Sequence, residues 1–507
     1  MELSSLLDEL HLSSSQKPLP SPPFPSITEL LSRLQDKLLG ASSDSETSSL
    51  FGRVEQLFKT ADPDWLFSPV LANDDVGQVE LQRAYRSLVS TMICCAALPL
   101  CEDDCGSLTA AAYQNVPSRV ILVCSVLRSL VGALGHRERA GLLLTVAPPV
   151  CVFAVTHFQD QAWTTPSSRV AAQRLQEALL RAGGWRDSVH LLMGDTSQQE
   201  EGGKNRGILE GVLDVLQPHL TKDLWQRSEA VKLVFGWILL QVPRPFLSPY
   251  LPRLLPPPLL FNDHYRPENC MLGVRCLHHI IVNTSASELR QFNRAEVVYQ
   301  ALFKHLYTSE ASVIELVLSC LLDLLLVFEK PPSSVASSCR KPSRHDDVLR
   351  LFLTHMEAEN KVPLRRIYAS ILPLYIDRMG VAVCRHLRRL ERVVLGYLEI
   401  RDPPEEINRL KTLEVLQKTT RAAWPRMEAR INVLLRCLLR LLVDVSSDSE
   451  LKDSVTQELM SQTVICIKLL DDCSLGKLQP LLQQVNSSCC SPEVFSCLAT
   501  ITTPTER

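Results

Sequence analysis

The chain has 507 residues, of which 46% are hydrophobic, and it carries a net charge of −3 with a pI near 6.5. This length and apolar content are enough to bury a large core, and the lack of excess basic charge argues against nucleic acid as a partner. Proteins are therefore the expected partners. The 17 cysteines lie mostly within apolar stripes, which is typical of reduced thiols and predicts a cytoplasmic location, with the nucleus as an alternative.

Residues 1–50 are predicted to form a mobile segment. The opening MELSSLLDELHLSSSQKPLP contains acidic residues and prolines where a signal peptide has a basic start and an unbroken apolar run. The following run SSDSETSS, residues 42–49, has the composition of a solvated loop. Phosphorylation at Ser43 or Ser45 is the less favoured interpretation of this run.

Residues 51–245 are predicted to form an irregular helical half. Helices are expected at residues 78–98, 117–134, 168–182, 208–216 and 228–241. Gly183 and Gly184 should end the third of them, and residues 196–207 should form a loop. Two apolar stretches, 120–134 and 140–155, are interrupted by Arg128 and by Pro148 with Pro149, so no membrane span is predicted.

Residues 243–258, PRPFLSPYLPRLLPPP, are rich in proline and predict an extended connector before a second region. A docking peptide for an aromatic groove is the alternative. Residues 246–475 are predicted to form HEAT-like helical repeats, with a Ser/Pro-rich loop at 331–345, and residues 476–507 a short helix and a flexible tail.

The stretch 293–330 carries the clearest helical pattern, because its second half is apolar except along one thin line. That line consists of Ser312, Glu315, Ser319 and Asp323. Spacings of three and four place these residues on one edge of a helix whose other sides are apolar. Such a helix must be buried between others, since each carboxylate would cost roughly 2.5 kcal/mol or more at the centre of a bilayer.

Similar helical stripes continue toward the carboxyl end. They cover residues 346–356, 362–379, 381–399, 405–424, 426–445 and 454–470. Taken in pairs, the first helices begin about 53, 35 and 45 residues apart, around the roughly forty residues of a HEAT-type repeat. The predicted fold is therefore all-α, a HEAT/armadillo-like α-solenoid of irregular helical pairs.

Sequence motifs of enzymes are absent: no GxxxxGK[ST], GxGxxG, HExxH or GxSxG pattern occurs. Two cysteine clusters are candidate zinc sites. The first consists of Cys270, Cys276, His278 and His279, and the second of Cys94, Cys95, Cys101 and Cys105. Adjacent His278 and His279 diverge on a helix, and the second cluster has no known zinc spacing. No catalytic, cofactor or metal site is predicted, and a metal-dependent enzyme is the disfavoured alternative.

One dense basic face is predicted on the stripe 381–399. It consists of Arg385, Arg388, Arg389 and Arg392, opposite the apolar Cys384, Leu387, Leu390 and Val394. A solvated helix face is the default interpretation. Binding of an acidic partner or an inositol phosphate is the more specific interpretation, because the planar guanidinium group of arginine forms paired hydrogen bonds with carboxylates and phosphates. We expect the helical repeats at 293–470 to supply much of the partner contact.

Five segments resemble one known family. They are VFAVTHFQDQAWTTPSSR from Val152, FGWILLQVPRPFLS from Phe235, ENCMLGVRCLHHI from Glu268, NRAEVVYQALFKHLYT from Asn293 and HLRRLERVVLGYLE from His386. These are similar to the second Tel-Two-interacting protein family, subunits of the Triple-T complex. The resemblance covers residues 146–473, apart from the Ser/Pro-rich loop, whereas the first hundred residues and the tail depart from it.

The resemblance implies a non-catalytic α-solenoid scaffold. Its partners would be the first Tel-Two-interacting protein and the Tel-Two protein. Together with the heat-shock chaperone machinery, the complex would support maturation of phosphatidylinositol-3-kinase-related kinases of the mTOR, ATM and ATR type, and hence DNA-damage and growth signalling. A generic armadillo-like adaptor for transport or phosphatase assembly is the alternative. The resemblance carries over no site residue.

Overall fold

The computed structural model describes residues 26–41, 43–67, 75–101, 108–135, 139–194, 207–334, 341–485 and 490–502. These residues form helices and no strand, which confirms the predicted all-α class. Contacts divide the chain into two units, Met1–Pro257 and Pro258–Arg507. The boundary lies about twelve residues after the predicted one, inside the short helix α13 (Pro256–Asn262).

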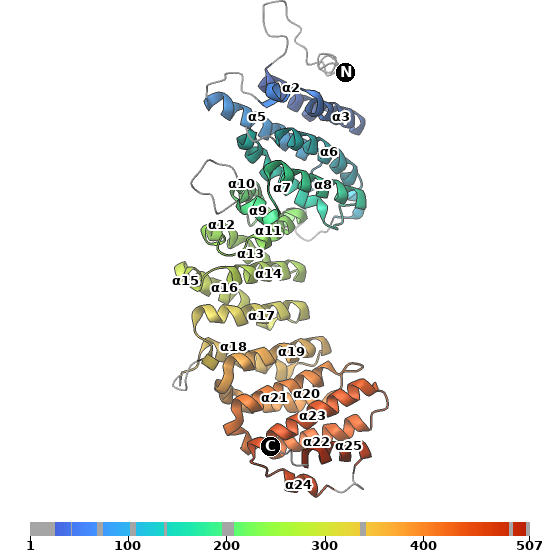
Figure 1. Ribbon diagram of the computed structural model, residues 1–507, viewed down its shortest axis with the longest axis vertical. Helices are drawn as coiled ribbons and strands as arrows, with labels where there is room; N and C mark the ends of the chain where they lie inside the picture. Colours follow the sequence, from blue (N-terminus) through green and yellow to red (C-terminus); the bar gives the residue numbers. More distant parts are fainter. Residues whose placement is uncertain are drawn as a thin grey trace, which may run out of the picture. The chain divides into compact units, whose positions relative to one another are not determined.

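The first unit consists of two layers of helices. Its helices are α2 (Ile27–Gly40), α3 (Asp44–Thr60), α4 (Pro63–Phe67), α5 (Asp75–Cys94), α6 (Val116–Leu134), α7 (Ala140–Phe158), α8 (Pro166–Gly183), α9 (Ser188–Met193), α10 (Leu209–Leu216), α11 (Glu229–Gln241) and α12 (Leu251–Leu254). One layer runs from α2 through α5 and α7 to α10 and α11, and the other from α3 through α6 to α8 (Figure 1). Each helix therefore packs on its partner in the pair and on the equivalent helix of the next pair, as in a solenoid.

The amino-terminal segment differs from the prediction. Residues 1–25 lie outside the described part, but α2 and α3 occupy most of the stretch expected to be mobile up to residue 50. The serine-rich run is a helix start, because the Ser43 hydroxyl accepts a hydrogen bond from the Glu46 amide (3.1 Å). Asp44 and Glu46 place negative charge in the first turn of α3, where the helix dipole favours it. Serine, aspartate and glutamate are thus common both in loops and at the beginning of helices.

Other turns follow the predicted chemistry. At α8, Thr165 and Ser168 form a reciprocal capping box around Pro166, which occupies the first turn. Its carboxyl end is Gly184 in the left-handed conformation (φ 68°), whose amide reaches back to the carbonyls of Arg181 and Leu180. This confirms the predicted stop at the paired glycines.

The proline-rich stretch 243–258 is not an extended connector. It contains a 3₁₀ turn (Ser248–Tyr250), α12 and the start of α13. Its leucines, Leu247, Leu251 and Leu254, are fully buried. Pro249, Pro252 and Pro256 lie in the first turns of these short helices, where a missing amide hydrogen costs no helical hydrogen bond.

The second unit repeats the two-layer arrangement. Its helices are α14 (Pro267–Asn283), α15 (Ala286–Arg290), α16 (Arg294–Phe303), α17 (Ala311–Phe328), α18 (Arg344–Ala358), α19 (Val362–Met379), α20 (Leu387–Glu399), α21 (Ile407–Met427), α22 (Ile431–Ser446), α23 (Asp453–Cys473), α24 (Gln479–Gln483) and α25 (Pro492–Thr502). One layer runs through α14, α17, α19, α21 and α23, and the second through α18, α20, α22 and α25 (Figure 1). As predicted, α17 is largely buried, and its uncovered edge carries Ser312, Glu315, Ser319 and Asp323 and ends at exposed Leu326.

Two helix boundaries in this unit differ from the sequence pattern. The stripe at 381–399 begins as a 3₁₀ helix (Gly380–His386), so α20 starts only at Leu387. Pro425 was expected to separate two helices, but it lies inside α21, whose helical conformation breaks at Ala423 (φ −112°, ψ 17°). Proline removes a backbone hydrogen bond and clashes with the preceding turn, so the helix kinks just before it.

Four helical stretches are long and apolar enough to cross a membrane by length and composition. They are Ala110–Leu134, Ala140–Phe158, Ala311–Phe328 and Val362–Glu399. Between 44% and 67% of the most apolar window in each stretch is buried inside the structure. Their apolar faces pack on neighbouring helices, for example α6 on α3 and α8, and α17 on α14 and α19. Helix packing in the core thus accounts for much of this apolar surface.

Candidate interaction surface

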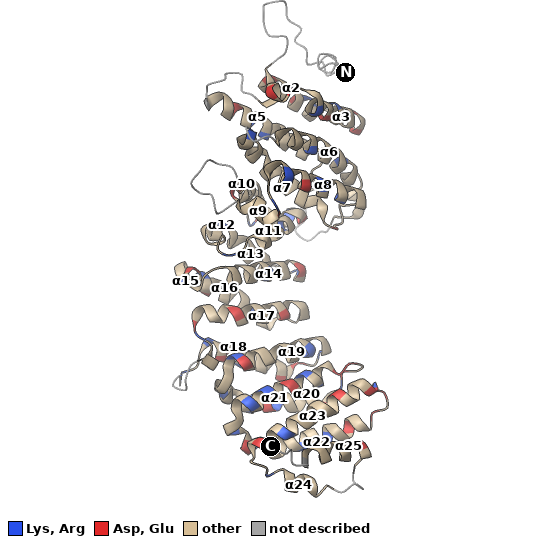
Figure 2. Ribbon diagram, in the orientation of Figure 1, with Lys and Arg blue, Asp and Glu red and all other residues tan. Residues whose placement is uncertain are grey.

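The four arginines of the predicted basic face lie on the outer side of the α20 segment. Arg385 belongs to the 3₁₀ helix before α20, and Arg388, Arg389 and Arg392 belong to α20 itself. The opposite side is apolar: Leu387, Leu390 and Val394 are buried, and Cys384 is half-buried. Figure 2 shows basic and acidic residues side by side on the helices of this region.

Three of the four arginines bind α18, the preceding helix of the same layer. The pairs are Arg385 with Asp346 (2.7 Å), Arg389 with the Thr354 hydroxyl, and Arg392 with Glu357 (2.9 Å). Arg389 also donates to the carbonyl of Arg350 (3.3 Å). Much of the predicted basic face therefore joins two repeats inside the chain.

The spacing of these pairs follows from the repeat. The paired residues are 39, 35 and 35 positions apart in sequence, whereas α18 and α20 begin 43 residues apart, at Arg344 and Leu387, and not 35 as predicted. Successive repeats of a solenoid pack side by side, so oppositely charged residues on facing sides of two neighbouring repeats can form ion pairs. The same rule places Lys418 of α21 against Asp377 of α19 (2.5 Å), 41 positions away.

Asp346 is the centre of this junction. Its carboxylate accepts hydrogen bonds from the Ser343 amide (2.9 Å) and hydroxyl (3.0 Å), from Arg385 (2.7 Å), and pairs with His386 Nε2 (2.9 Å). Burial alone would raise the pKa of Asp346, but the hydrogen bonds from His386 and Ser343 and the charge of Arg385 lower it to about 2. The same residue therefore caps α18 and holds α20 against it.

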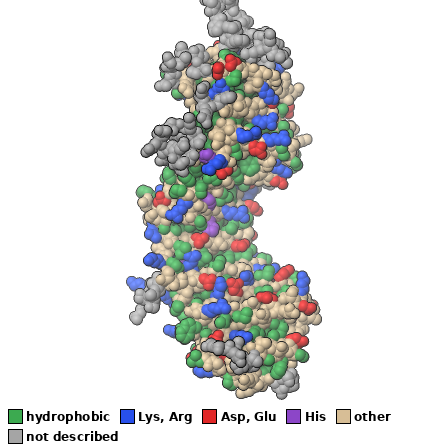
Figure 3. Space-filling model, viewed as in Figure 1, with side chains coloured by type: hydrophobic (Ala, Val, Ile, Leu, Met, Phe, Trp, Pro, Cys, Tyr) green, Lys and Arg blue, Asp and Glu red, His purple; other side chains and the backbone are tan. Residues whose placement is uncertain are grey.

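Arg388 differs from its three neighbours. It is exposed and makes no ion pair or hydrogen bond to any side chain in the described part of the chain. On the face shown in Figure 3, charged side chains in this unit are interspersed with hydrophobic ones. Of the predicted cationic surface, Arg388 is the member that stays fully available to an outside carboxylate or phosphate.

The polar line of α17 has a similar connecting role. Asp323 pairs with His278 of α14 (2.8 Å) and lies 3.9 Å from Arg378 of α19. Tyr375 of α19, fully buried, donates its hydroxyl hydrogen to the Leu318 carbonyl (2.8 Å). Through Asp323, the polar line of this buried helix thus links three successive helices of one layer.

Comparison with known proteins identifies the chain's relatives. TELO2-interacting protein 2 of human is 44% identical over 345 residues, which cover 68% of this chain and 67% of that protein. The mouse protein of the same name is 42% identical over 395 residues, 76% of each chain, and the rat protein is 42% identical over 351 residues, 69% of this chain and 68% of that protein. The chain belongs to the TELO2-interacting protein 2 family. No protein-family model matches it.

Membership of the TELO2-interacting protein 2 family confirms the resemblance drawn from the five sequence segments. Solved structures with a similar course of helices include the karyopherin Kap121p (TM-score 0.41, 14% identity, 95% of this chain and 47% of that one). Kap95p in a structure with RanGDP is another (TM-score 0.46, 14% identity, 93% and 61%). At this level of similarity, these structures carry nothing about partners.

The described members of the two cysteine clusters do not gather into a metal-binding group. Burial raises the pKa of Cys270 to about 11 and of Cys276 to about 12, and His278 pairs with Asp323. In the second cluster, Cys94 is exposed and Cys105 lies outside the described residues. Across the described ranges, no three His, Cys, Asp or Glu residues are placed to hold a metal ion.

The sequence analysis missed the acidic and hydroxyl partners of the arginine face, Asp346, Thr354 and Glu357. They share one side of α18 because they follow spacings of eight and three residues. A signal was present, since shifting the arginine positions back by the predicted interval of 35 residues lands on Thr354 and Glu357. Applying the repeat interval to charges as well as to apolar residues would have found them.

Proposed function

We propose that this chain binds TELO2 as a non-catalytic scaffold subunit of the Triple-T complex, together with the first Tel-Two-interacting protein. In this role it supports the maturation of phosphatidylinositol-3-kinase-related kinases of the mTOR, ATM and ATR type with the heat-shock chaperone machinery. The observation that carries the proposal is the 42–44% identity to TELO2-interacting protein 2 of three mammals, over at least two thirds of each chain.

The architecture is compatible with a scaffold. Two-layer helical units expose long faces of successive helices, and such faces suit large helical partners. Three polar groups have a structural role: buried Asp346 and His386, and half-exposed Asp323, each join helices of neighbouring repeats. Stacked helices held at fixed spacing by ion pairs at their junctions provide a rigid surface for assembly.

Affinity purification of the tagged full-length chain from cells, followed by mass spectrometry at moderate salt, tests the proposal. We expect TELO2 and the first Tel-Two-interacting protein in comparable amounts, and loss of kinase protein when the chain is depleted. Enrichment of transport or phosphatase subunits without these two proteins would refute the proposal and favour the generic adaptor.

Within this function, we propose the α20 arginine face as part of the partner contact, with Arg388 as its principal cation. Arg388→Glu alters no internal bond, so it should leave folding intact and weaken co-purification with the first Tel-Two-interacting protein. Reversal of both Arg388 and Arg389 should weaken it further. Arg83→Glu, at an exposed arginine of α5 outside this face, is the matched control for charge reversal. Unchanged co-purification of the Arg388 and Arg389 variants would show that this face is not the contact.

A further inference from the structure

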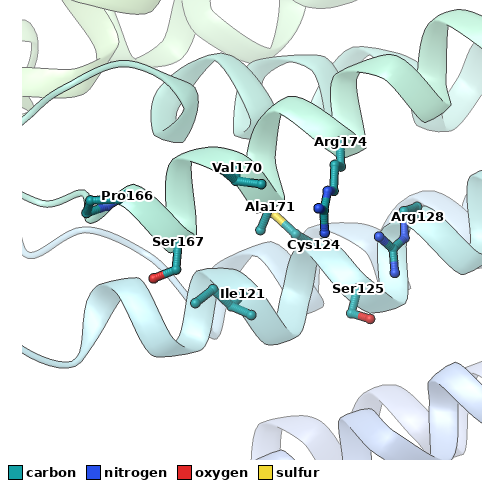
Figure 4. A pocket seen from close by; sticks show the side chains of 9 residues that line it. All are labelled: Ile121, Cys124, Ser125, Arg128, Pro166, Ser167, Val170, Ala171 and Arg174. Carbon is teal, nitrogen blue, oxygen red and sulfur yellow. The ribbon is translucent and has the colours of Figure 1, made fainter.

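An open groove of about 520 Å³ runs between α6 and α8 in the first unit (Figure 4). The side chains that line it are Ile121, Cys124, Ser125 and Arg128 of α6, and Pro166, Ser167, Val170, Ala171 and Arg174 of α8. Within each helix these positions recur at intervals of three, four and seven or eight residues, so each helix contributes one face. The groove therefore extends over about two helical turns, roughly 10 Å of axial length.

The two ends of the groove differ in chemistry. Ile121 and Pro166 lie toward one end and Arg128 and Arg174 toward the other (Figure 4). The apolar side chains are unusually open for a helix junction: Ile121 is 36% exposed and Val170 is 43% exposed. An occupant would thus meet an apolar surface first and two guanidinium groups about two turns further along.

The two arginines form no ion pair with the residues that the structure describes. Neither Arg128 nor Arg174 makes an ion pair or hydrogen bond to a side chain in the parts of the unit that the structure describes. Arginines elsewhere on the same helices do: Arg119 of α6 binds Asp44 (2.7 Å) and Arg169 of α8 binds Asp160. In the folded unit, Arg119 and Arg169 thus have acidic partners, whereas Arg128 and Arg174 form no ion pair with the described residues.

The carboxylate next to the groove is already engaged. Glu55 of α3 binds Lys59 (2.5 Å) and accepts a hydrogen bond from the Ser125 hydroxyl (2.9 Å). These hydrogen bonds and the charges of Lys59 and Arg128 hold its pKa below the usual value, although burial alone would raise it. Glu55 therefore stays charged and hydrogen-bonded to Lys59 and Ser125, and the two arginines beside the groove outnumber this single carboxylate.

We propose that the α6/α8 groove binds an acidic amphipathic helix of a protein partner. Apolar side chains of that helix would pack on Ile121 and Val170, and carboxylates one to two turns further along would meet Arg128 and Arg174. Guanidinium groups bind carboxylates through paired hydrogen bonds, and an apolar groove of two turns fits a helix with anchors at spacings of three, four and seven. A small phosphate would use only the cationic end and leave the apolar end uncovered.

The inference rests on the proposed function for the identity of the partner, which is the complex of TELO2 with the first Tel-Two-interacting protein. The test uses the purified full-length chain and measures its affinity for that complex by biolayer interferometry at low and moderate salt. The variants are Arg128→Glu with Arg174→Glu, and Val170→Asp for the apolar end. The matched control is Arg83→Glu with Arg86→Glu, two exposed arginines of α5 in the other layer.

We expect at least a tenfold loss of affinity for both groove variants, a weaker salt dependence for the arginine variant, and a change within twofold for the control. The alanine pair Arg128→Ala and Arg174→Ala replaces the reversal pair if circular dichroism shows that the latter is unfolded. A photo-crosslinker at Val170 should join a partner peptide that carries aspartate or glutamate within two turns of an apolar residue.

Each outcome decides the question. If the wild-type chain binds the complex and the groove variants bind equally well, the groove inference fails and the proposed function stands. If the control loses affinity as strongly as the groove variants, bulk charge and not the groove is responsible, which also overturns the inference. If the wild-type chain binds neither protein, the proposed function fails and the groove assignment fails with it.

Discussion

Replacing Asp346 by asparagine isolates the junction between α18 and α20. The side chain is 5% exposed and accepts hydrogen bonds from Ser343 and Arg385, and it pairs with His386. Asparagine has nearly the same volume, so the packing of the site is kept. It removes the negative charge and leaves one acceptor oxygen where the carboxylate has two. The variant therefore tests charge-assisted bonding with little change in shape.

The expected cost follows from the pKa. The pKa of Asp346 falls from 3.8 to about 2 on folding, and each unit corresponds to about 1.4 kcal/mol. The carboxylate thus contributes about 2 kcal/mol to the free energy of unfolding near neutral pH. Because the folded pKa is the lower one, this contribution is present above pH 4 and is lost as the pH falls toward 2. The difference between wild type and Asp346→Asn should shrink over that range.

Hydrogen exchange and denaturation can check both parts. At pH 7, amides of α18 and α20 should exchange roughly 30-fold faster in the variant, since 1.4 kcal/mol corresponds to a factor of ten. Urea midpoints followed by circular dichroism should differ between variant and wild type at pH 6, and the difference should fall to about a third by pH 2.5. Asp347→Asn is the control, because its exposed pair with Arg350 is long (3.6 Å) and should contribute less than about 1 kcal/mol.

A constant difference between the two proteins from pH 6 to pH 2.5 would refute the reasoning, since it would show that the carboxylate charge is not the source of the stability. Faster exchange confined to helices of the first unit would also contradict it. Equal effects of the Asp346 and Asp347 variants would mean that burial and geometry do not distinguish these adjacent carboxylates.

Two further predictions concern packing and thiol chemistry. Gly273→Ala should destabilise the second unit by about 2 kcal/mol, because the new Cβ would lie 2.4 Å from the backbone nitrogen of Asn262. Gly396→Ala, on α20, should stabilise the same unit by up to about 1 kcal/mol, because no atom lies within 4 Å of the new Cβ. Thermal melts of both variants measure the two changes in stability. Burial raises the pKa of Cys151 to about 12, so iodoacetamide at pH 8 should label exposed Cys94 and leave Cys151 unmodified in the native protein, as peptide mass spectrometry would show. Alkylation of Cys151 at the rate of Cys94 would contradict its burial.

Helical periodicity predicted most helices because the apolar stripe of each one is a property of its own residues. The expected helix at 362–379 agrees with α19 (Val362–Met379). The stripe 293–330 correctly identified a helix buried between others. Periodicity misjudged the amino-terminal serine run and the proline-rich stretch because caps and first turns use the same residues as loops. There, the neighbouring buried leucines decide the conformation.

The arginine face shows where sequence reasoning about a site ends. Periodicity placed Arg385, Arg388, Arg389 and Arg392 on one side of a helix, but it could not show that α18 supplies partners for three of them. In the same way, Arg128 was visible only as an interruption of an apolar stretch. Its place beside Arg174 in a groove depends on α8 lying parallel to α6 (Figure 4).

The sequence alone determined the helical class and the family, because these depend on local periodicity and on long stretches of matching residues. Tertiary structure decided which charges are bound and which are free. A side chain's availability depends on what the next repeat places a few ångströms away, and that contact lies some 35 to 49 positions distant along the chain. Arg388, Arg128 and Arg174 can therefore be recognised as free cations only once the helices are packed.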